Sequence, residues 1–468
     1  MNLPLQIDLM AHVSLLKPEF EQVNSSQVLI NSISTQINLC TEDTLLFYNL
    51  KDSKQAQTSF NERMQNCLSK NIIVSSVPWK IPADRNVFVM SVDKFMQAKI
   101  TFSNLIYPLK KEPTYIGITG TNGKTTTAYL LNQLLTSMGE ESLYIGTLGA
   151  YKGKSKVAAN FETTTPDYIE LRACIFGLGK IDYCILEASS HALEQNRLKG
   201  IKFIAAGWTN ISQDHLDYHG NMENYLAAKL KITNLLYPDG KLVVAPEQGE
   251  LFENVKLKYT NTIQSKKEII TGTEYPLFLH YQYNQENLSL AVEIIGILGL
   301  QIKPENISDL TAPPGRLESF EIDGRFIFID YAHTPDALNR LLLETKKAFP
   351  GKFISVVFGC GGNRDRSKRP IMGKVVENNS NAMIVTSDNP RDEDPNAIID
   401  DIVNGITSSN KVLIEPDRRN AIIKAFSNSP INSIIIIAGK GHENYQEIAG
   451  LKHTFDDKEI VKSLKELT

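Results

Sequence analysis

The chain has 468 residues, of which 42% are hydrophobic and 22% are charged, and its formal net charge is −4. The near-balance of 49 Lys and Arg against 53 Asp and Glu predicts that neither nucleic acid nor a membrane surface is a partner. No apolar run is long enough to cross a bilayer, no secretory signal is recognisable, and the five cysteines show no paired spacing. We therefore expect a cytoplasmic protein with free thiols and no membrane insertion.

The first domain is expected to span residues 1–107, where short apolar runs alternate with polar segments as in a small α/β domain. A segment of linker composition follows at 107–113, with two prolines and a Lys-Lys-Glu run. This change of composition predicts a domain boundary, and a second domain that spans residues 108–312.

A glycine-rich turn opens the second domain. An apolar run at 115–118 leads into Gly-Ile-Thr-Gly-Thr-Asn-Gly-Lys-Thr-Thr-Thr at 117–127, and a helical pattern follows. Strand, glycine turn and helix together form a cradle for phosphate groups, in which a lysine adds positive charge and a hydroxyl can bind Mg²⁺. Ile118 departs from the strict pattern, so the loop is a variant with glycines at 117, 120 and 123. An ordinary strand-to-helix turn is the alternative, and the Lys-Thr-Thr-Thr run disfavours it.

Further polar clusters follow apolar runs in this domain. Glu187 ends a predicted strand and could hold Mg²⁺, although a carboxylate at this place is by itself more often simply solvated. Two histidines and two aspartates lie close together at 214–219, which indicates a site. Lys229 lies on a helical stretch and by itself would be interpreted as a surface lysine.

The third domain is expected to span residues 313–468, because two prolines and a glycine interrupt regular structure at 311–316. Strand-like runs alternate here with amphipathic helical patterns, and Thr334-Pro335-Asp336 is a typical helix start. The alternation predicts a mostly parallel, doubly wound sheet whose strands lie at 326–329, 354–358, 382–386, 412–414 and 434–438.

The chain resembles the Mur ligases, the ATP-dependent enzymes that add amino acids to the peptidoglycan precursor, and especially the members that add the third residue. The motifs that carry the resemblance lie at 117–127, 163–166, 187–197, 209–220, 314–316, 330–335, 359–370, 388–391 and 439–443. The resemblance implies three α/β domains: an N-terminal domain for the UDP end of the substrate, a central P-loop ATPase-type domain, and a Rossmann-like C-terminal domain for the amino acid. It also implies that a substrate carboxylate attacks ATP to form an acyl phosphate, which an amine then opens.

The resemblance assigns roles to residues of the central and last domains. Lys124, His215 and Lys229 correspond to catalytic positions, and Lys229 to a lysine that is carbamylated in the family. The implied ligands of Mg²⁺ are Thr125, Glu187, His215 and the Lys229 carbamate. The implied ATP contacts are Thr119, Gly120, Thr121, Asn122, Gly123, Lys124, Thr125, Asn287, Arg316, Asp330 and His333.

The other two substrates have implied contacts of their own. The UDP-MurNAc-dipeptide corresponds to Ser32, Thr163, Thr164, Thr165, Ser189, Gln195 and Arg197. Here the chain departs from the family twice, since Asn-Ser-Ile at 31–33 replaces the common Asp-Ser-Arg and Thr163 replaces a common Asn. The amino-acid substrate corresponds to Arg364, Asp388, Asn389, Pro390, Arg391, Gly439 and Glu443.

Arg391 discriminates between the possible amino acids. Members of the family that add meso-diaminopimelate carry Asp-Asn-Pro-Arg, as this chain does at 388–391, and a guanidinium grips a second carboxylate with two hydrogen bonds. The side-chain ammonium of lysine would instead be repelled. The alternative for Arg391 is that it only pairs with the neighbouring acids Asp392, Glu393 and Asp394.

The expected substrates are UDP-MurNAc-L-Ala-D-Glu, meso-diaminopimelate and ATP, with Mg²⁺, on a monomeric enzyme. A lysine-adding Mur ligase and a ligase similar to folylpolyglutamate synthase stay as alternatives. A nucleotide-dependent switch protein is a third, although it would lack a second substrate site.

Overall fold

The computed structural model describes residues 4–24, 28–157, 161–267 and 275–466. The chain divides into two compact units. The first contains the chain up to Thr121 together with Gly139–Val243 and Glu250–Ile263. The second contains Asn122–Met138, Val244–Gly249 and the chain from Gln264 onward.

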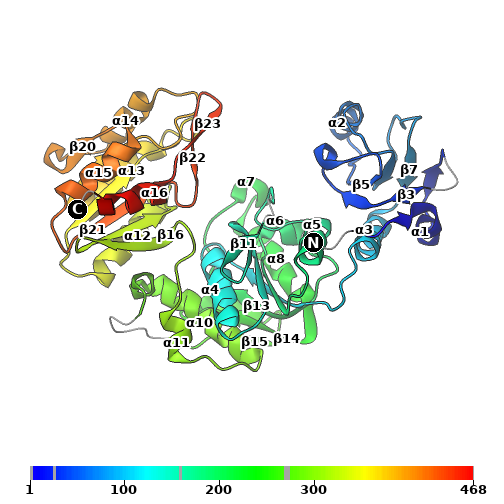
Figure 1. Cartoon of the computed structure of the whole chain (residues 1–468), viewed down its shortest axis with the longest axis horizontal. Coiled ribbons are helices and arrows are strands. Elements are labelled where there is room, and N and C mark those ends of the chain that lie inside the picture. Colours follow the sequence, from blue (N-terminus) through cyan, green and yellow to red (C-terminus); the bar gives the residue numbers. More distant parts are fainter. Residues whose placement is uncertain (1–3, 25–27, 158–160, 268–274, 467–468) are drawn as a thin grey trace. The chain divides into compact units, whose positions relative to one another are not determined.

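The N-terminal part of the first unit is built on a five-stranded sheet with the order β2-β7-β6-β5-β4 (Figure 1). Only the pair β2 and β7 is antiparallel. These strands are β2 (Phe20–Gln22), β4 (Ser32–Ser34), β5 (Thr44–Tyr48), β6 (Asn71–Val74) and β7 (Asn86–Val89), beside a separate pair β1 (Ile7–Asp8) and β3 (Leu29–Ile30). The helices are α1 (Leu9–Leu16), η1 (Ile37–Leu39), α2 (Lys54–Met64) and α3 (Val92–Ile106). The expected α/β character of this segment is confirmed.

The same unit contains an eight-stranded sheet with the order β11-β10-β9-β12-β8-β13-β14-β15. The strands β9, β12, β8 and β13 are parallel to one another, so the carboxyl ends of four neighbouring strands meet at one edge. The bounds are β8 (Thr114–Thr119), β9 (Ser142–Gly146), β10 (Gly149–Lys152), β11 (Ser155–Val157), β12 (Tyr183–Glu187), β13 (Phe203–Trp208), β14 (Leu236–Val244) and β15 (Thr262–Gln264). The helices of this segment are α5 (Tyr168–Leu178), α6 (Ser190–Glu194), α7 (Leu216–His219), α8 (Met222–Leu230), η2 (Lys231–Leu235) and α9 (Gly249–Lys256).

Helices α3 and α5 pack together in the first unit, and their apolar side chains share one core cluster that includes Phe102, Ile106 and Phe176. A half-buried ion pair joins the same helices, with Lys99 Nζ 2.7 Å from Asp167 Oδ2. Asp167 also caps α5 in a capping box with Glu170. The segment 108–113 lies between α3 and β8 without regular structure, as its composition predicts.

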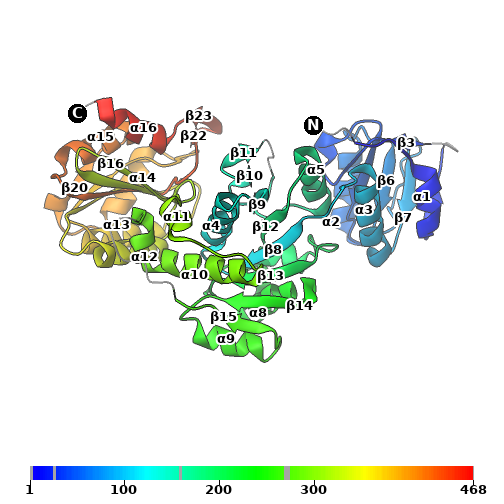
Figure 2. The same ribbon diagram turned by 60° about the horizontal axis from the view of Figure 1, so that its bottom comes forward.

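In the second unit, α4 (Lys124–Ser137) packs against α10 (Gln282–Ile297), as Figure 2 shows. Gln133, on α4, accepts two hydrogen bonds from Thr311 and donates one to its carbonyl. These three hydrogen bonds attach the segment around Thr311, which leads into the last sheet, to α4. The short elements η3 (Leu277–His280) and α11 (Pro304–Ser308) flank α10.

The last sheet has six strands in the order β16-β17-β21-β18-β19-β20 and is parallel except for β16. Its strands are β16 (Arg316–Ile322), β17 (Arg325–Asp330), β18 (Ile354–Phe358), β19 (Ala382–Val385), β20 (Val412–Ile414) and β21 (Ile434–Ala438). The helices are α12 (Pro335–Ala348), α13 (Lys368–Asn379), α14 (Pro395–Val403), η4 (Ser409–Lys411), α15 (Arg418–Asn428), α16 (Asp457–Ser463) and η5 (Leu464–Glu466), and a hairpin joins β22 (Tyr445–Ile448) to β23 (Leu451–Thr454). The expected doubly wound sheet is confirmed.

Strand β16 was not expected. The strand that ends at Asp330, β17, is therefore the second strand of this sheet along the chain and not the first. Its sequence, Arg-Leu-Glu-Ser-Phe-Glu-Ile, alternates polar and apolar residues because β16 is an edge strand that is only partly buried. The five expected strands are apolar runs, and β18 and β21 are buried along their whole length. The positions of the two boundaries between the three expected domains stay predictions.

Candidate active site

The glycine-rich loop joins β8 directly to the start of α4. Gly120 and Gly123 have φ angles of 138° and 85°, in the region that side chains rarely adopt. A Cβ on Gly120 would lie 1.9 Å from Thr209 Oγ1, and one on Gly123 would lie 2.4 Å from Asn287 Oδ1. Helix α4 therefore starts directly after a turn whose backbone requires glycines at 120 and 123. The N-terminus of a helix stabilises bound phosphate.

Gly117 is not part of the glycine-rich turn, in which it was expected. It lies inside β8, where a Cβ would meet the ring of Phe203 at 2.8 Å. Phe203 belongs to the neighbouring strand β13. Gly117 is thus a packing glycine of the sheet, and the turn itself depends on Gly120 and Gly123.

Asn287 lies on α10 and is buried beside the start of α4. Its Oδ1 accepts a hydrogen bond of 3.2 Å from Thr127, and its amide nitrogen donates to Asn284. The predicted ATP contact Asn287 therefore lies next to Gly123 within the second unit.

Glu187 ends β12, as expected, and its side chain is fully buried. The carboxylate accepts hydrogen bonds from the hydroxyl of Tyr144 (2.5 Å), the backbone N–H of Thr147 (2.9 Å) and the hydroxyl of Thr147 (3.2 Å). A Cβ on Gly146 would lie 2.1 Å from Glu187 Oε1. Tyr144 and Thr147 were missed, and the sequence signal for them was the glycine pair at 146 and 149, which ends β9 and begins β10.

The residues expected to bind the sugar and peptide lie together, apart from Ser32. The hydroxyl of Thr165 contacts Ser189 Oγ at 3.1 Å and donates to the Glu187 carbonyl at 2.6 Å. Arg197 donates to Thr163 Oγ1 and to the Thr165 carbonyl at 2.9 and 3.1 Å.

Two more members complete this group. Gln195 accepts two hydrogen bonds from Arg197, and Thr164 accepts one from Thr147. The predicted contacts of the UDP-MurNAc-dipeptide are thus joined in one network around the end of β12. Ser32 instead lies on β4 in the N-terminal sheet, where its hydroxyl contacts Thr44 Oγ1 at 2.8 Å.

His215 lies in a cluster of aromatic rings. Its ring is 4.9 Å from that of His191, which is in turn 5.4 Å from that of His219. The backbone of His215 has a φ of 52°, and its Nε2 lies 3.5 Å from Asp214 Oδ2. Burial, and second the charge of nearby His215, lower the pKa of His191. His219 belongs to the predicted group at 214–219, whereas His191 was not expected in the site, although it stands within the motif at 187–197.

Lys229 is not a surface lysine. Its side chain is buried on α8, and Nζ donates a hydrogen bond of 2.7 Å to the carbonyl of Gly120 and lies 4.5 Å from the centre of the Tyr225 ring. Tyr225 in turn contacts the hydroxyl of Thr121 at 3.1 Å. Lys229 is therefore attached to the first part of the glycine-rich loop.

The predicted nucleotide contacts of the last domain surround Tyr331. The guanidinium of Arg316 lies over its ring at 4.8 Å, and His333 Nδ1 contacts its carbonyl at 2.8 Å. The carboxylate of Asp330 accepts backbone hydrogen bonds from Leu317 and Ala332, both at 2.9 Å. Burial raises the pKa of Asp330, while Arg316 and the two backbone N–H groups oppose the rise.

The residues expected to bind the amino acid also lie together. Asn389 donates to Glu443 Oε2 at 2.8 Å and accepts hydrogen bonds from Lys440 Nζ and from the backbone of Glu447. A Cβ on Gly439 would lie 2.7 Å from Asp388 Oδ2. A Cβ on Gly361 would lie 2.9 Å from Arg391 Nη1, 3.7 Å from Arg364 Cγ and 3.8 Å from the Asn389 carbonyl.

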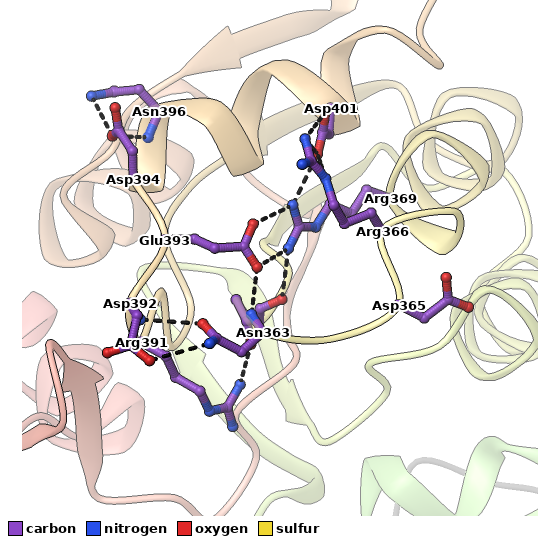
Figure 3. Close-up of polar contacts among 12 residues, drawn as sticks. Asn363, Asp365, Arg366, Arg369, Arg391, Asp392, Glu393, Asp394, Asn396 and Asp401 are labelled. Atoms are coloured by element: carbon purple, nitrogen blue, oxygen red, sulfur yellow. Dashed lines mark hydrogen bonds and ion pairs between the residues drawn. The ribbon is translucent and has the colours of Figure 1, made fainter.

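Arg391 does not pair with its acidic neighbours in the sequence. Its Nη1 donates to the Gly362 carbonyl at 2.8 Å, and its Nε forms an ion pair with Glu447 Oε2 at 3.2 Å. The adjacent acids have other partners: Asp392 binds Asn363, Glu393 binds Arg369, and Asp394 caps α14. Figure 3 shows Glu393 pointing toward Arg369 while Arg391 points away from both.

A buried arginine holds the two loops that carry this site. The Arg369 side chain is fully buried and donates to both oxygens of Glu393, to Asp401 and to the Gly361 carbonyl (Figure 3). The contact with Arg369 holds the pKa of Glu393 at about 2. These contacts join 361–363 to 391–393, the segments that position Arg391.

Residues 118–297 match the family described as Mur ligase middle domain, and residues 315–441 match the Mur ligase, glutamate ligase domain. The UDP-N-acetylmuramoyl-L-alanyl-D-glutamate--2,6-diaminopimelate ligase of Aquifex aeolicus is 40% identical, over 75% of this chain and 77% of that protein. The chain belongs to the Mur ligase family.

Two further relatives align with nearly the whole of this chain. The enzyme of the same name from Rickettsia conorii is 34% identical, over 96% of this chain and 97% of its own length. A solved structure of a UDP-N-acetylmuramoyl-L-alanyl-D-glutamate--2,6-diaminopimelate ligase superposes with a TM-score of 0.64 at 27% identity, over 99% of both chains. The expectation that the chain is a ligase of this family, and so an enzyme, is confirmed.

The donors expected to hold Mg²⁺ in this Mur ligase include the carboxylate of Glu187 and the hydroxyl of Thr125, which are hard oxygen ligands of the kind that Mg²⁺ prefers. Among the residues that the structure describes, no three His, Cys, Asp or Glu side chains gather in a way that could hold a metal by themselves. The metal site of Thr125, Glu187, His215 and the Lys229 carbamate stays a prediction.

Lys440 lies within the motif at 439–443 but was not among the residues expected in the site. Its side chain is fully buried, and Nζ lies 3.3 Å from Glu443 Oε2 and 3.8 Å from Asp388 Oδ1. It offsets the negative charge that these two carboxylates bring to the site. Separately, across the described residues, helices long and apolar enough to pass through a membrane are absent.

Proposed function

We propose that this Mur ligase joins meso-2,6-diaminopimelate to UDP-MurNAc-L-Ala-D-Glu with the hydrolysis of ATP, in the synthesis of the peptidoglycan precursor. The observation that carries the proposal is the group formed by Arg391, Asn389 and Glu443. It combines a guanidinium and a carboxylate, as a ligand with both a carboxylate and an ammonium at its far end requires. The names of the relatives support the same amino acid.

Arg391 can bind the distal carboxylate because part of its guanidinium is available. The protein uses Nε and one position of Nη1, and Nη2 has no partner among the residues that the structure describes. Glu443 can accept the distal ammonium. Lysine has no distal carboxylate, so its side-chain ammonium would lie near the guanidinium of Arg391 with no negative charge of its own to offset the repulsion.

The reaction brings several anions together. The carboxylate of the dipeptide attacks the γ-phosphorus of ATP, which releases ADP and forms an acyl phosphate. The amine of diaminopimelate then attacks the acyl carbon, and phosphate leaves from the tetrahedral intermediate. Lys124 and the loop of Gly120 and Gly123 hold the phosphates in place, so the chain contributes mainly positioning and positive charge.

We assign Thr125, Glu187, His215 and carbamylated Lys229 as the residues that hold Mg²⁺, which would supply charge neutralisation at the phosphates when bound. Thr119, Thr121, Asn122, Asn287 and Arg316 would position ATP, with Asp330 and His333. Carbamylation requires the neutral amine, and the side chain of Lys229 is buried on α8.

The uridine end of the substrate has a candidate place in the first unit. A hollow of about 470 Å³ lies between η1, the end of α2 and Glu162, the residue directly before Thr163. Arg63 contributes a positive charge to its wall. The hollow thus adjoins both the N-terminal sheet that carries Ser32 and the network that carries Thr163, as a nucleotide-sugar that reaches both would require.

The test is a product assay that offers meso-diaminopimelate and L-lysine in equal amounts with ATP and the UDP-MurNAc-dipeptide. We expect the diaminopimelate adduct to dominate, and equal use of lysine would overturn the choice of amino acid. Transfer of ¹⁸O from the dipeptide carboxyl group to released phosphate tests the acyl phosphate. ADP release with a folate substrate, but not with the dipeptide, would favour the folylpolyglutamate synthase alternative.

A further inference from the structure

The hairpin of β22 and β23 is attached to the loop at 388–391 by its first strand. Arg391 pairs with Ile448 as an isolated parallel bridge, in which Arg391 N–H donates to the Glu447 carbonyl at 2.9 Å and Ala449 N–H donates to the Arg391 carbonyl at 2.7 Å. Gln446 also donates to the Asp388 carbonyl at 2.7 Å. The hairpin therefore fixes the backbone of Arg391, which is held at a φ of 53°.

The side chain of Arg391 is held by two groups on different segments. The Gly362 carbonyl accepts from Nη1 at 2.8 Å, and Glu447 Oε2 lies 3.2 Å from Nε. A guanidinium has five N–H groups in one plane, so contacts at two of its nitrogens define the orientation of the whole plane. The nitrogen left over, Nη2, is then directed to one place.

We propose that Glu447 is a positioning residue for Arg391: its carboxylate forms an ion pair on the Nε side of the guanidinium and so turns the Nη end toward the distal carboxylate of the amino-acid substrate. The inference rests on the proposed function and deepens it. Without Glu447 the guanidinium can rotate about its side-chain bonds and can bind a carboxylate through Nε instead. The substrate would then lose the single geometry in which its distal carboxylate is recognised.

The backbone contacts make Glu447 suitable for substitution. The bridge between β22 and Arg391 uses only main-chain atoms of Glu447, so Glu447→Ala and Glu447→Gln remove the charge and leave the bridge in place. The Glu447 side chain is 27% exposed, so its replacement leaves no buried cavity. Glu459, a 66% exposed acid in an ion pair with Lys462, provides the matched control Glu459→Ala in the same domain.

The experiment measures kcat and KM for all three substrates in the full-length enzyme, in both Glu447 variants, in Arg391→Ala and in the double variant Arg391→Ala/Glu447→Ala. We expect Glu447→Ala to raise the KM for meso-diaminopimelate about tenfold, as loss of one charged contact would, with kcat and the KM for ATP unchanged. The isosteric Glu447→Gln, which keeps the shape, should raise the same KM about threefold. The control should match the unaltered enzyme.

The double variant decides whether Glu447 acts through Arg391. If it does, Glu447→Ala has less than about a twofold further effect once Arg391 is absent, because the two substitutions are then strongly non-additive. Additive effects, or an equal rise in KM for ATP, would show a merely structural role and overturn the inference. If the unaltered enzyme uses diaminopimelate, the proposed function stands even where the positioning role of Glu447 fails. If the unaltered enzyme uses lysine alone, the proposed function and the role of Glu447 are both overturned.

Discussion

The ammonium group of Lys229, on α8, donates a 2.7 Å hydrogen bond to the carbonyl of Gly120, in the loop that follows β8. A buried lysine is thus attached to the turn that is expected to hold the triphosphate. The contact brings a residue without any sequence signal of its own to the predicted phosphate loop.

Replacement of Lys229 tests this role. We expect Lys229→Ala to lower kcat about a hundredfold, as the loss of a preorganised charged group does. Lys229→Arg keeps a cation but cannot form a carbamate, so it should be equally inactive. With ¹³C-bicarbonate, the unaltered enzyme should show a carbamate signal by NMR that both variants lack. An active Lys229→Arg would contradict the prediction.

Glu187→Gln should raise the Mg²⁺ concentration needed for half-maximal activity by about 10–100-fold, because a neutral amide is a poor ligand for Mg²⁺. Tyr144→Phe removes one hydrogen bond to the same carboxylate and should shift the Mg²⁺ requirement less, in the same direction. Titration of activity with Mg²⁺ at saturating ATP measures both. An unchanged requirement in Glu187→Gln would exclude Glu187 as a metal ligand.

Arg391→Ala should raise the KM for meso-diaminopimelate about 10–100-fold, the value of one or two charged hydrogen bonds, and leave the KM for ATP unaffected. Arg391→Lys keeps the charge but not the planar fork, so it should recover only part of the loss. Steady-state kinetics with each substrate varied in turn provides the measurement. A parallel rise in the KM for ATP would point to general damage.

Gly117→Ala should destabilise the first unit by about 1–3 kcal/mol, because its Cβ would overlap the buried ring of Phe203. In α5, Gly177→Ala is the control: nothing lies within 4 Å of its Cβ, so it should be stabilising by about 0.5–1 kcal/mol. Urea denaturation followed by the fluorescence of Trp208, buried in β13 with Phe203, reports on this sheet. Equal effects of the two substitutions would contradict the packing role.

Glu393→Gln should lower stability at pH 7, since it weakens the contact with buried Arg369 by about 1.5–3 kcal/mol. The folded-state pKa of Glu393, about 2, is below the ordinary value, so its contribution is complete above about pH 4.3 and disappears as the pH falls toward 2. The difference in the free energy of unfolding between Glu393→Gln and the unaltered enzyme should therefore shrink as the pH falls from about 5 to about 2. Denaturation curves across this range would show a constant difference if Glu393 were unshifted.

Much of the architecture was predictable because strongly apolar, periodic runs identify buried strands. The runs at 354–358 and 434–438 coincide with β18 and β21, which are fully buried. The edge strand β16 was missed because one side of it is not covered, and its residues alternate without a long apolar run. The same limit applies to β22, which is only partly buried, and to β23, which is exposed.

The sequence by itself determined the family, and it predicted the phosphate loop and the residues expected to carry the chemistry, because these depend on side-chain types at short spacings along the chain. Only the tertiary structure decided their partners: Glu447 and Gly362 for Arg391, Tyr144 and Thr147 for Glu187, Gly120 for Lys229. Each of these contacts joins segments far apart in the chain. Whether such segments meet depends on how strands and loops pack, which no local pattern of residues contains.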